Sequence, residues 1–590
     1  MRLSTRRRAA MLGGGSVRIH GRASRRVVVI AVLTALAACE SPTSIGDVDA
    51  LEGIEGIEEL DAPAPARQIP EAAPVVRSPL ARRLEVFAAK VAARRAGVQQ
   101  ARIPEPPDLT SAAGPTAVFD VAGLDAAIRK IVAPLERTTD VSVHIRELAS
   151  DDVLFDYRGD APLNPASNQK LLTAAAALDL LGADFRFETR VLLHEDALYV
   201  IGEGDPTLDE AALRALAAEI RGAVDMTRLR RLVVDDLAFS PRTLAPGFSD
   251  AGVGEAYQAP SGALSLAFNT VEVTVTAPRT RAKRGETVKL VVTLRPRSPH
   301  VVVDDQAVVG PGTLKLRSYA GMELAGQART VLELTGKLRA GRTLRERRRV
   351  VDPGLYTGGA LAAMLSEETG LAMLPVERGV APGPAQRPTL VARRESGPLQ
   401  EIAGGALAWS NNFMAEQLLR TLGWRMTGAP GDWDNGARVV QAYWDALGLP
   451  DDALVFENGS GFSQRGRVTT TALVDLIAVA SRVSGGEGLL SALPVAGEEG
   501  TLRARLRRSG KRVRAKTGTM AGISGLSGVI TAEDGTPQVA FSILSNVRDG
   551  GASASTRRKR AEDAIVTAVL KALDAWAVER SSAHAAKPVP

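Results

Sequence analysis

The chain has 590 residues, of which 45% are hydrophobic and 4% aromatic, so it can bury a large core and is long enough for several domains. This composition excludes a fibrous protein. The formal net charge is +6, but residues 1–38 hold eight arginines and no acidic residue, and subtracting these eight charges leaves −2 on the remainder. The excess positive charge therefore belongs to the N-terminal segment and does not indicate a nucleic-acid partner.

The N-terminal segment has the pattern of an export signal. Its arginines precede an apolar run over residues 27–38, which only Thr34 interrupts and which is too short to span a bilayer. Cys39 follows, and it is the only cysteine in the sequence, so no internal disulfide can form. With Leu36-Ala37-Ala38 before it, the segment resembles a bacterial lipoprotein signal, which implies cleavage before Cys39 and lipid attachment to its sulfur. The alternative is a plain secretory signal with a chance cysteine.

Either interpretation exports the chain. The lipoprotein resemblance implies a periplasmic protein that touches a membrane through its lipid alone, and Glu40 resembles the residue found in lipoproteins released to an outer membrane. Residues 39–115 are rich in Pro, Ala and acidic residues, which predicts a flexible tether without a packed core. Within this tether Leu80, Leu84, Phe87 and Val91 recur at helical spacing, most simply as a short solvated helix.

The remaining elements predict an α/β catalytic domain, over residues 116–184 and 351–580, interrupted by a β-rich insertion over 185–350. Helical periodicity predicts helices at 124–128, 171–181, 358–368, 400–422, 470–483 and 561–578. Alternation predicts strands at 141–145, 271–275, 288–292, 512–516, 526–530 and 538–544.

Three short motifs carry the chemistry. Ser167 and Lys170 form S-x-x-K at a predicted helix start, where a spacing of three puts hydroxyl and amine on one face. Ser410 and Asn412 form S-x-N before a second helix, and residues 516–519 read Lys-Thr-Gly-Thr on a predicted strand. Each motif alone is common. Their order along the chain makes chance a poor explanation, and the sequence here resembles the penicillin-binding proteins and serine β-lactamases.

Further stretches narrow the resemblance to the low-molecular-mass penicillin-binding proteins, the D-alanyl-D-alanine carboxypeptidase and endopeptidase family with a large insertion between the first two motifs. These stretches are residues 202–208, 262–269, 459–461 and 493–497. The gap from Ser167 to Ser410 leaves room for that insertion, which β-lactamases lack. The resemblance covers about residues 120–573 and implies a penicillin-binding, β-lactamase-like transpeptidase fold. Asn411 and Met520 depart from the family's usual residues, and neither is expected to do chemistry.

The resemblance implies a role for each motif residue. Ser167 is expected to attack the carbonyl of the penultimate D-alanine of a peptidoglycan stem peptide, with Lys170 as base. The roles implied for the other residues are proton relay by Ser410, positioning by Asn412, carboxylate binding by Lys516 and Thr517, close approach of the substrate backbone at Gly518, and an oxyanion site between the amides of Ser167 and Thr519. β-Lactams are expected to inhibit by acylating Ser167.

Other chemistries find little support in the sequence. None of the five histidines adjoins a nucleophile-like serine motif, and no group of residues has metal-ligand spacing, so we expect neither a catalytic triad nor a metal or other cofactor. Two alternatives stay open at this point: a β-lactamase or esterase on the same site, and a penicillin-binding sensor or scaffold with little turnover. The insertion argues against the first, and the intact set of motif residues argues against the second. The oligomeric state is not predicted.

Overall fold

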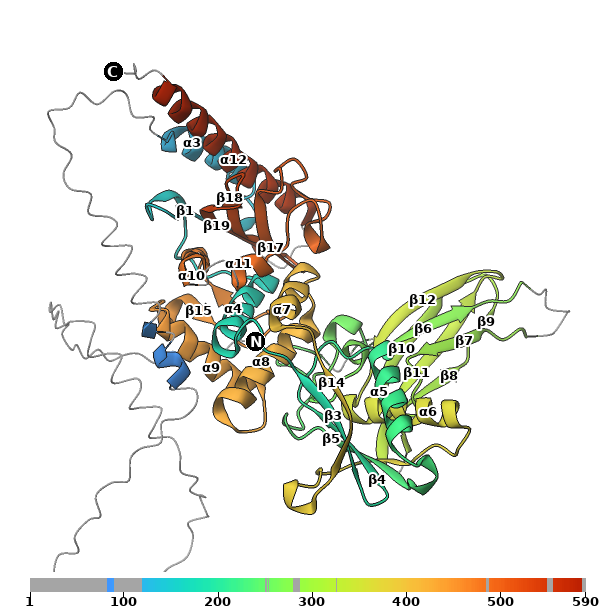
Figure 1. Cartoon of the computed structure of the whole chain (residues 1–590). Helices are drawn as coiled ribbons and strands as arrows, with labels where there is room; N and C mark the ends of the chain where they lie inside the picture. The colour runs from blue at the N-terminus through green and yellow to red at the C-terminus, as the bar shows by residue number, and fades with distance from the viewer. Residues whose placement is uncertain are drawn as a thin grey trace, which may run out of the picture. The chain divides into compact units, whose positions relative to one another are not determined.

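A computed structural model describes residues 82–86, 88–89, 119–249, 252, 254–279, 287–324, 326–483, 488–548 and 555–585 (Figure 1). The predicted signal peptide (1–38), Cys39 and most of the predicted tether (39–115) lie outside the described residues. None of the described helices is long and apolar enough to cross a membrane.

One antiparallel sheet of five strands joins the two ends of the described fold, in the order β17-β18-β19-β1-β2. The strands are β1 (Thr139–Glu147), β2 (Val153–Tyr157), β17 (Val513–Met520), β18 (Ile523–Thr531) and β19 (Pro537–Val547). Because β1 pairs with β19 over nine residues, the start and the end of the described fold share one sheet. Every residue of β18 is buried, which indicates that both faces of the sheet are covered.

Helices cover these two faces. On one face, Ile128 of α3 and Val566 of α12 join the hydrophobic core formed with Phe541 and Ile543 of β19. Figure 1 shows α3 and α12 side by side along the strands. On the other face, Leu544 belongs to the core around α4. The outer helices are α3 (Val121–Val132), α12 (Ser555–Ala585) and α10 (Thr470–Val483).

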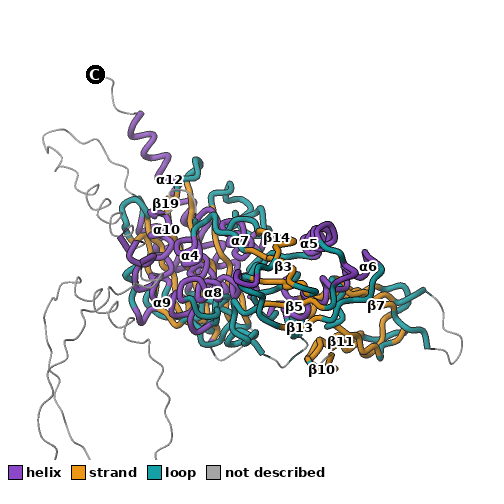
Figure 2. Tube along the Cα trace, turned by 60° about the horizontal axis from the view of Figure 1, so that its bottom comes forward, coloured by secondary structure: helices purple, strands orange, loops and turns teal. Residues whose placement is uncertain are grey.

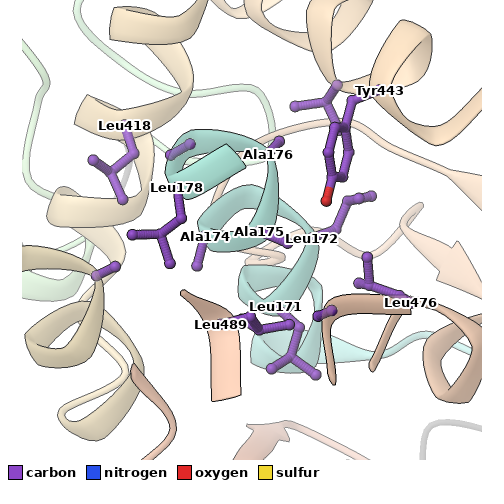
Figure 3. Close-up of a cluster of buried hydrophobic side chains, with 14 of the residues drawn as sticks. Leu171, Leu172, Ala174, Ala175, Ala176, Leu178, Leu418, Tyr443, Leu476 and Leu489 are labelled. Carbon is purple, nitrogen blue, oxygen red and sulfur yellow. The ribbon is translucent and has the colours of Figure 1, made fainter. Parts of the chain in front are cut away.

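Helix α4 is the centre of the second core. Ten of its twelve residues are buried, and its run of alanines lets neighbouring helices approach closely (Figure 3). Leu418, Tyr443, Leu476 and Leu489 surround it from four other helices. The elements of this part are α4 (Lys170–Leu181), α7 (Leu399–Ala408), α8 (Asn412–Thr427), α9 (Trp433–Ala446), α11 (Leu489–Ala492), β15 (Leu454–Val455) and β16 (Arg467–Val468).

The segment between the first two motifs builds a core of its own from three sheets and two helices. A mixed sheet has the order β13-β5-β4-β3-β14, and two smaller sheets have the orders β12-β6-β7 and β10-β11-β8, with β9 beside β11. In Figure 2 the strands β7, β10 and β11 gather on the side of α6. The bounds are β3 (Glu188–His194), β4 (Ala197–Gly202), α5 (Glu210–Ala223), β5 (Arg231–Asp235), β6 (Thr270–Thr276), β7 (Val291–Arg295), β8 (Val301–Asp305), β9 (Val308–Val309), β10 (Leu314–Leu324), β11 (Gln327–Leu338), β12 (Thr343–Arg349), α6 (Pro353–Thr369), β13 (Val376–Arg378) and β14 (Thr389–Glu395).

The mixed α/β fold class is confirmed, and several local predictions need correction. The helix predicted at 400–422 is two helices, α7 and α8, because Ser410 between them has a left-handed φ of 54°. The strand predicted at 288–292 begins at Val291, and α5 was not predicted although Leu213, Leu216 and Ile220 follow helical spacing. Strands β13 and β14 join the sheet of β3, β4 and β5, and this sheet therefore has strands on both sides of residue 350. The domain boundary proposed at residue 350 stays a prediction.

The short helix near residue 84 is not a purely solvated one. Leu84 is only 7% exposed and belongs to the core around α4. Arg83 donates a hydrogen bond of 2.7 Å from Nη1 to the carbonyl of Leu180 at the end of α4. Leu84 is therefore a packing residue, whereas the other three residues of the stripe, Leu80, Phe87 and Val91, lie outside the described residues.

Arg420 ties α8 to the chain between the first two motifs. Its buried guanidinium donates to the carbonyls of Ser261 (2.7 Å), Ser240 (2.7 Å) and Gly431 (3.1 Å). It also lies 4.5 Å from the ring centres of both Phe239 and Trp433. Such a cation is stable in the interior because its donors are satisfied and aromatic faces surround it.

We expect Arg420→Met to lower the free energy of unfolding by about 3 kcal/mol, because three carbonyls lose a charged donor. The exposed Arg438 on α9 provides a matched control, and Arg438→Met should change stability by less than about 0.5 kcal/mol. Urea unfolding followed by circular dichroism measures both. Equal stability of the two variants would contradict this assignment.

Candidate active site

Ser167 lies in a short 3-10 helix, η1 (Ala166–Gln169), which runs directly into α4 at Lys170. The turn is strained at Ala166, whose φ of 44° is unusual for a residue with a Cβ. Asn164 holds it: its Oδ1 accepts from the Ala166 amide at 2.9 Å, and its Nδ2 donates to the Ser463 carbonyl at 2.8 Å. The surrounding structure therefore fixes the backbone that carries the Ser167 hydroxyl.

The Lys170 amine is the centre of the site. Its Nζ lies 2.9 Å from Ser167 Oγ, 2.7 Å from Asn412 Oδ1 and 2.7 Å from the carbonyl oxygen of Ser460. The side chain is 1% exposed, and burial lowers the pKa of Lys170 to about 7, while the negative charge of Glu416 acts in the opposite direction. The amine can therefore exchange a proton near neutral pH.

Asn412 connects this amine to the chain between the first two motifs. It is the first residue of α8, and its Nδ2 donates to the Tyr257 carbonyl at 2.9 Å while its Oδ1 accepts from Lys170. The neighbouring Asn411 caps α8, because its Oδ1 accepts from the Met414 amide at 3.1 Å. Asn411 thus stabilises the start of α8. The preceding residue, Ser410, has a left-handed backbone conformation that turns the chain into this helix.

A turn over residues 458–461 supplies the third partner of Lys170. Gly461 has φ 72°, and a Cβ there would lie 2.1 Å from the carbonyl oxygen of Ala166. Only glycine allows this close approach, which presses the turn against η1. The Ser460 carbonyl is consequently held beside the Lys170 amine.

The strand β17 passes along the other side of η1. A Cβ on Gly518 would lie 2.6 Å from both the Pro165 carbonyl oxygen and Asn168 Nδ2, so glycine is required here for the strand to approach η1. The sequence prediction gave a different reason, room for the substrate backbone. Next to it, Lys516 is fully buried and Thr517 is nearly so, whereas Thr519 is exposed.

The positive charge of Lys170 acts on the buried amine of Lys516. Burial, and after it the positive charge of Lys170, holds the pKa of Lys516 well below its usual value. Lys516 Nζ donates to the Thr517 carbonyl at 2.7 Å, and Thr517 Oγ1 donates to Thr501 Oγ1 at 2.8 Å. A negatively charged ligand near Lys516 would favour its protonated form.

The predicted residues converge to different degrees. Direct hydrogen bonds join Ser167, Lys170 and Asn412, and η1 packs against the strand that carries residues 516–519. Within the described residues, neither the Ser410 hydroxyl nor the Thr519 hydroxyl makes a hydrogen bond. Among these same residues no cluster of His, Cys, Asp or Glu could hold a metal ion.

Sequence reasoning missed four contributors: Tyr257, Glu416, Ser460 and Thr501. The stretch Gly459-Ser460-Gly461 was noted as part of the resemblance, but no role was assigned to it. Glu416 could have been found from its position one helical turn after Asn412. Tyr257 contributes only a backbone carbonyl, so its side chain carried no signal.

Comparison with known proteins places the chain in a family. The family model of the D-Ala-D-Ala carboxypeptidase 3 (S13) family matches residues 124–569. A D-alanyl-D-alanine carboxypeptidase of an Actinomadura species is 34% identical over 436 residues, which cover 70% of this chain and 78% of that protein. The carboxypeptidase DacB of Mycolicibacterium smegmatis is 26% identical over 414 residues, or 67% of this chain and 73% of the relative.

A solved structure shows the same fold. The crystal structure of penicillin binding protein 4 (dacB) from Haemophilus influenzae superposes with a TM-score of 0.61 at 21% identity, covering 75% of this chain and 98% of that one. The family match spans all three motifs and the segment between the first two. The chain therefore belongs to the D-Ala-D-Ala carboxypeptidase 3 family, and it is a serine-type peptidase that acts on peptidoglycan, as its motifs predicted.

Proposed function

We propose that Ser167 is the nucleophile of this carboxypeptidase and that Lys170 is its general base. The observation that carries the proposal is the set of three contacts at Lys170 Nζ. A neutral amine has two N–H groups and one lone pair. The oxygens of Asn412 and Ser460 are acceptors, so each can bind an N–H group of the amine but not its lone pair. The lone pair is therefore left for the proton of Ser167 Oγ.

The reaction then follows from the positions of the other residues. Ser167 Oγ bonds to the carbonyl carbon of the penultimate D-alanine and passes its proton to Lys170. The amides of Ser167 and Thr519 stabilise the resulting oxyanion. This assignment is supported by the packing of β17, which carries Thr519, against η1, which carries Ser167. The C–N bond breaks, a proton relayed by Ser410 reaches the leaving amine of D-alanine, and water hydrolyses the acyl ester.

Substrate recognition rests on the charge of the terminal carboxylate. We assign its binding to Lys516 and Thr517, with Gly518 keeping the strand close to η1. Because burial and the positive charge of Lys170 disfavour the protonated form of Lys516, an incoming carboxylate would stabilise that form. The same charge pattern suits a β-lactam, which carries a carboxylate beside its reactive amide. The structure of Haemophilus influenzae penicillin binding protein 4 in complex with a β-lactam is consistent with this proposal.

No observation favours the two alternative functions. A scaffold has no need for the buried Lys170 amine and its three hydrogen-bond partners, because burying an ionisable amine without catalytic use costs stability. A β-lactamase has no use for the large segment between the first two motifs, which here reaches the site through Tyr257.

We also propose that the chain is a periplasmic lipoprotein, anchored by lipid on Cys39 after removal of residues 1–38, with the outer membrane as its destination. Support comes from the arginine-rich start, the apolar run and the single cysteine. Peptidoglycan lies outside the cytoplasmic membrane, so an exported location agrees with the family's substrate.

Incubation with a fluorescent penicillin should label the wild-type protein on the peptide that contains Ser167 and should not label Ser167→Ala. Mass mapping of the labelled peptide identifies the position. Circular dichroism of the variant serves as the folding control. Label on a different residue, or equal labelling of the folded variant, would refute the assignment of the nucleophile.

The rate of acylation should depend on pH through Lys170. Below its pKa of about 7 the amine is protonated and cannot accept the Ser167 proton, so the rate should fall as the pH is lowered through that value. Stopped-flow acylation by penicillin between about pH 5 and about pH 9 measures this profile. Lys170→Met should lose about 10²-fold or more in rate at every pH. A flat wild-type profile would be inconsistent with Lys170 as base.

Cys39→Ser should abolish lipid attachment. The full chain and the variant are expressed in a bacterium fed an alkyne-labelled fatty acid, and the label is detected on the purified proteins. The wild type should be labelled and should sediment with outer membranes, whereas the variant should be unlabelled. Persistent label on the variant would exclude Cys39 as the attachment site.

A further inference from the structure

Glu416 is a buried carboxylate beside the site that the reaction described above does not use. It lies one turn after Asn412 on α8 and is 1% exposed. Its oxygens accept hydrogen bonds from Trp433 Nε1 (2.8 Å), the Gly459 amide (2.9 Å) and the Ser460 amide (2.9 Å). Burial raises the pKa of Glu416 above its ordinary value, and the Ser460 side chain opposes that rise, followed by the Gly459 amide, Trp433 and the Ser460 amide.

Two of these three bonds fix the turn that touches Lys170. The Gly459 and Ser460 amides point to Glu416, and the next amide, of Gly461, donates to Asn458 Oδ1 at 2.8 Å. The Ser460 carbonyl belongs to the following peptide unit, whose amide is that of Gly461. With the amides on both sides of the Ser460 Cα held, this carbonyl oxygen faces Lys170 Nζ at 2.7 Å. The direction of the Lys170 lone pair depends on this acceptor, so Glu416 acts on the base through the backbone of one residue, Ser460.

Glu416 also contributes charge. It is the nearby negative group that opposes the effect of burial on Lys170. On the side of β17 the charged neighbour is Lys516, and the acidic residue just before the turn, Glu457, is paired with Arg465. Arg420, one turn further along α8, is the other cation that Glu416 influences.

We propose that Glu416 is a positioning residue for acylation: its carboxylate holds the Gly459–Ser460 turn so that the Ser460 carbonyl orients the Lys170 amine, and it supplies the buried negative charge opposite that amine. This inference rests on the proposed roles of Ser167 and Lys170. It goes beyond the three motifs, because Glu416 belongs to none of them and touches neither nucleophile nor base directly.

The test compares pH profiles of acylation by a fluorescent penicillin. Glu416→Gln removes the charge and leaves one amide oxygen to accept a backbone N–H. We expect the midpoint of the acid limb to move to lower pH by about one unit, because Lys170 loses the charge that stabilises its protonated form. The limiting rate should fall by about tenfold, because the turn is held less firmly. Glu416→Asp keeps the charge but is one methylene too short, so its limiting rate should fall while its midpoint stays.

Glu562 provides a matched control. It is also a buried carboxylate, 2% exposed, with bonds from Ser524 Oγ (2.5 Å) and Arg505 Nη2 (2.8 Å), and it lies on α12 across the sheet from α4. Glu562→Gln should lower stability without moving the midpoint. A purely structural role for Glu416 would likewise change the folded fraction, and with it the amplitude of labelling, but not the midpoint.

The outcomes separate the inference from the proposed function. An unchanged midpoint in folded Glu416→Gln overturns the inference while the wild-type profile and the unlabelled Ser167→Ala still support the proposed function. Labelling of Ser167→Ala, or a wild-type rate without an acid limb, overturns the proposed function itself. If Glu416→Gln does not fold, the limiting rate of Glu416→Asp decides: a tenfold loss at an unchanged midpoint supports the positioning role, and a wild-type rate refutes it.

Discussion

The Lys170 amine is almost fully buried, and a cation in such a place is costly unless its charge and its donors are compensated. Two carbonyl oxygens and one hydroxyl surround it, with one carboxylate beyond the backbone of Ser460. Compensation is incomplete, because burial disfavours the charged amine more than the negative charge of Glu416 favours it, and this keeps the amine close to losing its proton at neutral pH. The neighbouring elements must therefore be placed accurately, since a displaced acceptor would change both the protonation and the direction of the lone pair.

This requirement explains why glycines lie where chain segments meet. Gly461 presses the turn against η1, and Gly518 lets β17 approach the same short helix. In both places a methyl group would overlap backbone atoms, so the elements would have to separate. Separation would move the Ser460 carbonyl away from Lys170, or the strand away from Ser167. Close packing of backbones is thus a condition for the chemistry as well as for stability.

The long segment between the first two motifs takes part in the site. Tyr257 accepts a hydrogen bond from Asn412, and Gln417 donates to the carbonyls of Gly204 and Gly262 from the same helix, α8. Arg420 adds its buried contacts one turn further on. Helix α8 therefore places Asn412 in the site at its first turn. Along its next turns, Gln417 and Arg420 bind the segment between the first two motifs. This arrangement gives the segment a way to affect the orientation of Asn412 without touching substrate.

The sequence by itself determined the motif residues, the mixed α/β fold class and the family, because S-x-x-K, S-x-N and K-T-G need only local spacing and order to be recognised. Helix α4 was predicted from its run of alanine and leucine and β1 from its alternation, although both elements are buried on more than one face. The break at Ser410, the sheet that joins β13 and β14 to β3–β5, and the contacts of Tyr257, Ser460 and Glu416 were decided only by tertiary structure. These features depend on backbone groups and on segments far apart in the chain. The spacing of Glu416 after Asn412 and the stretch 459–461 mark positions in the sequence, but they do not show which groups these residues contact.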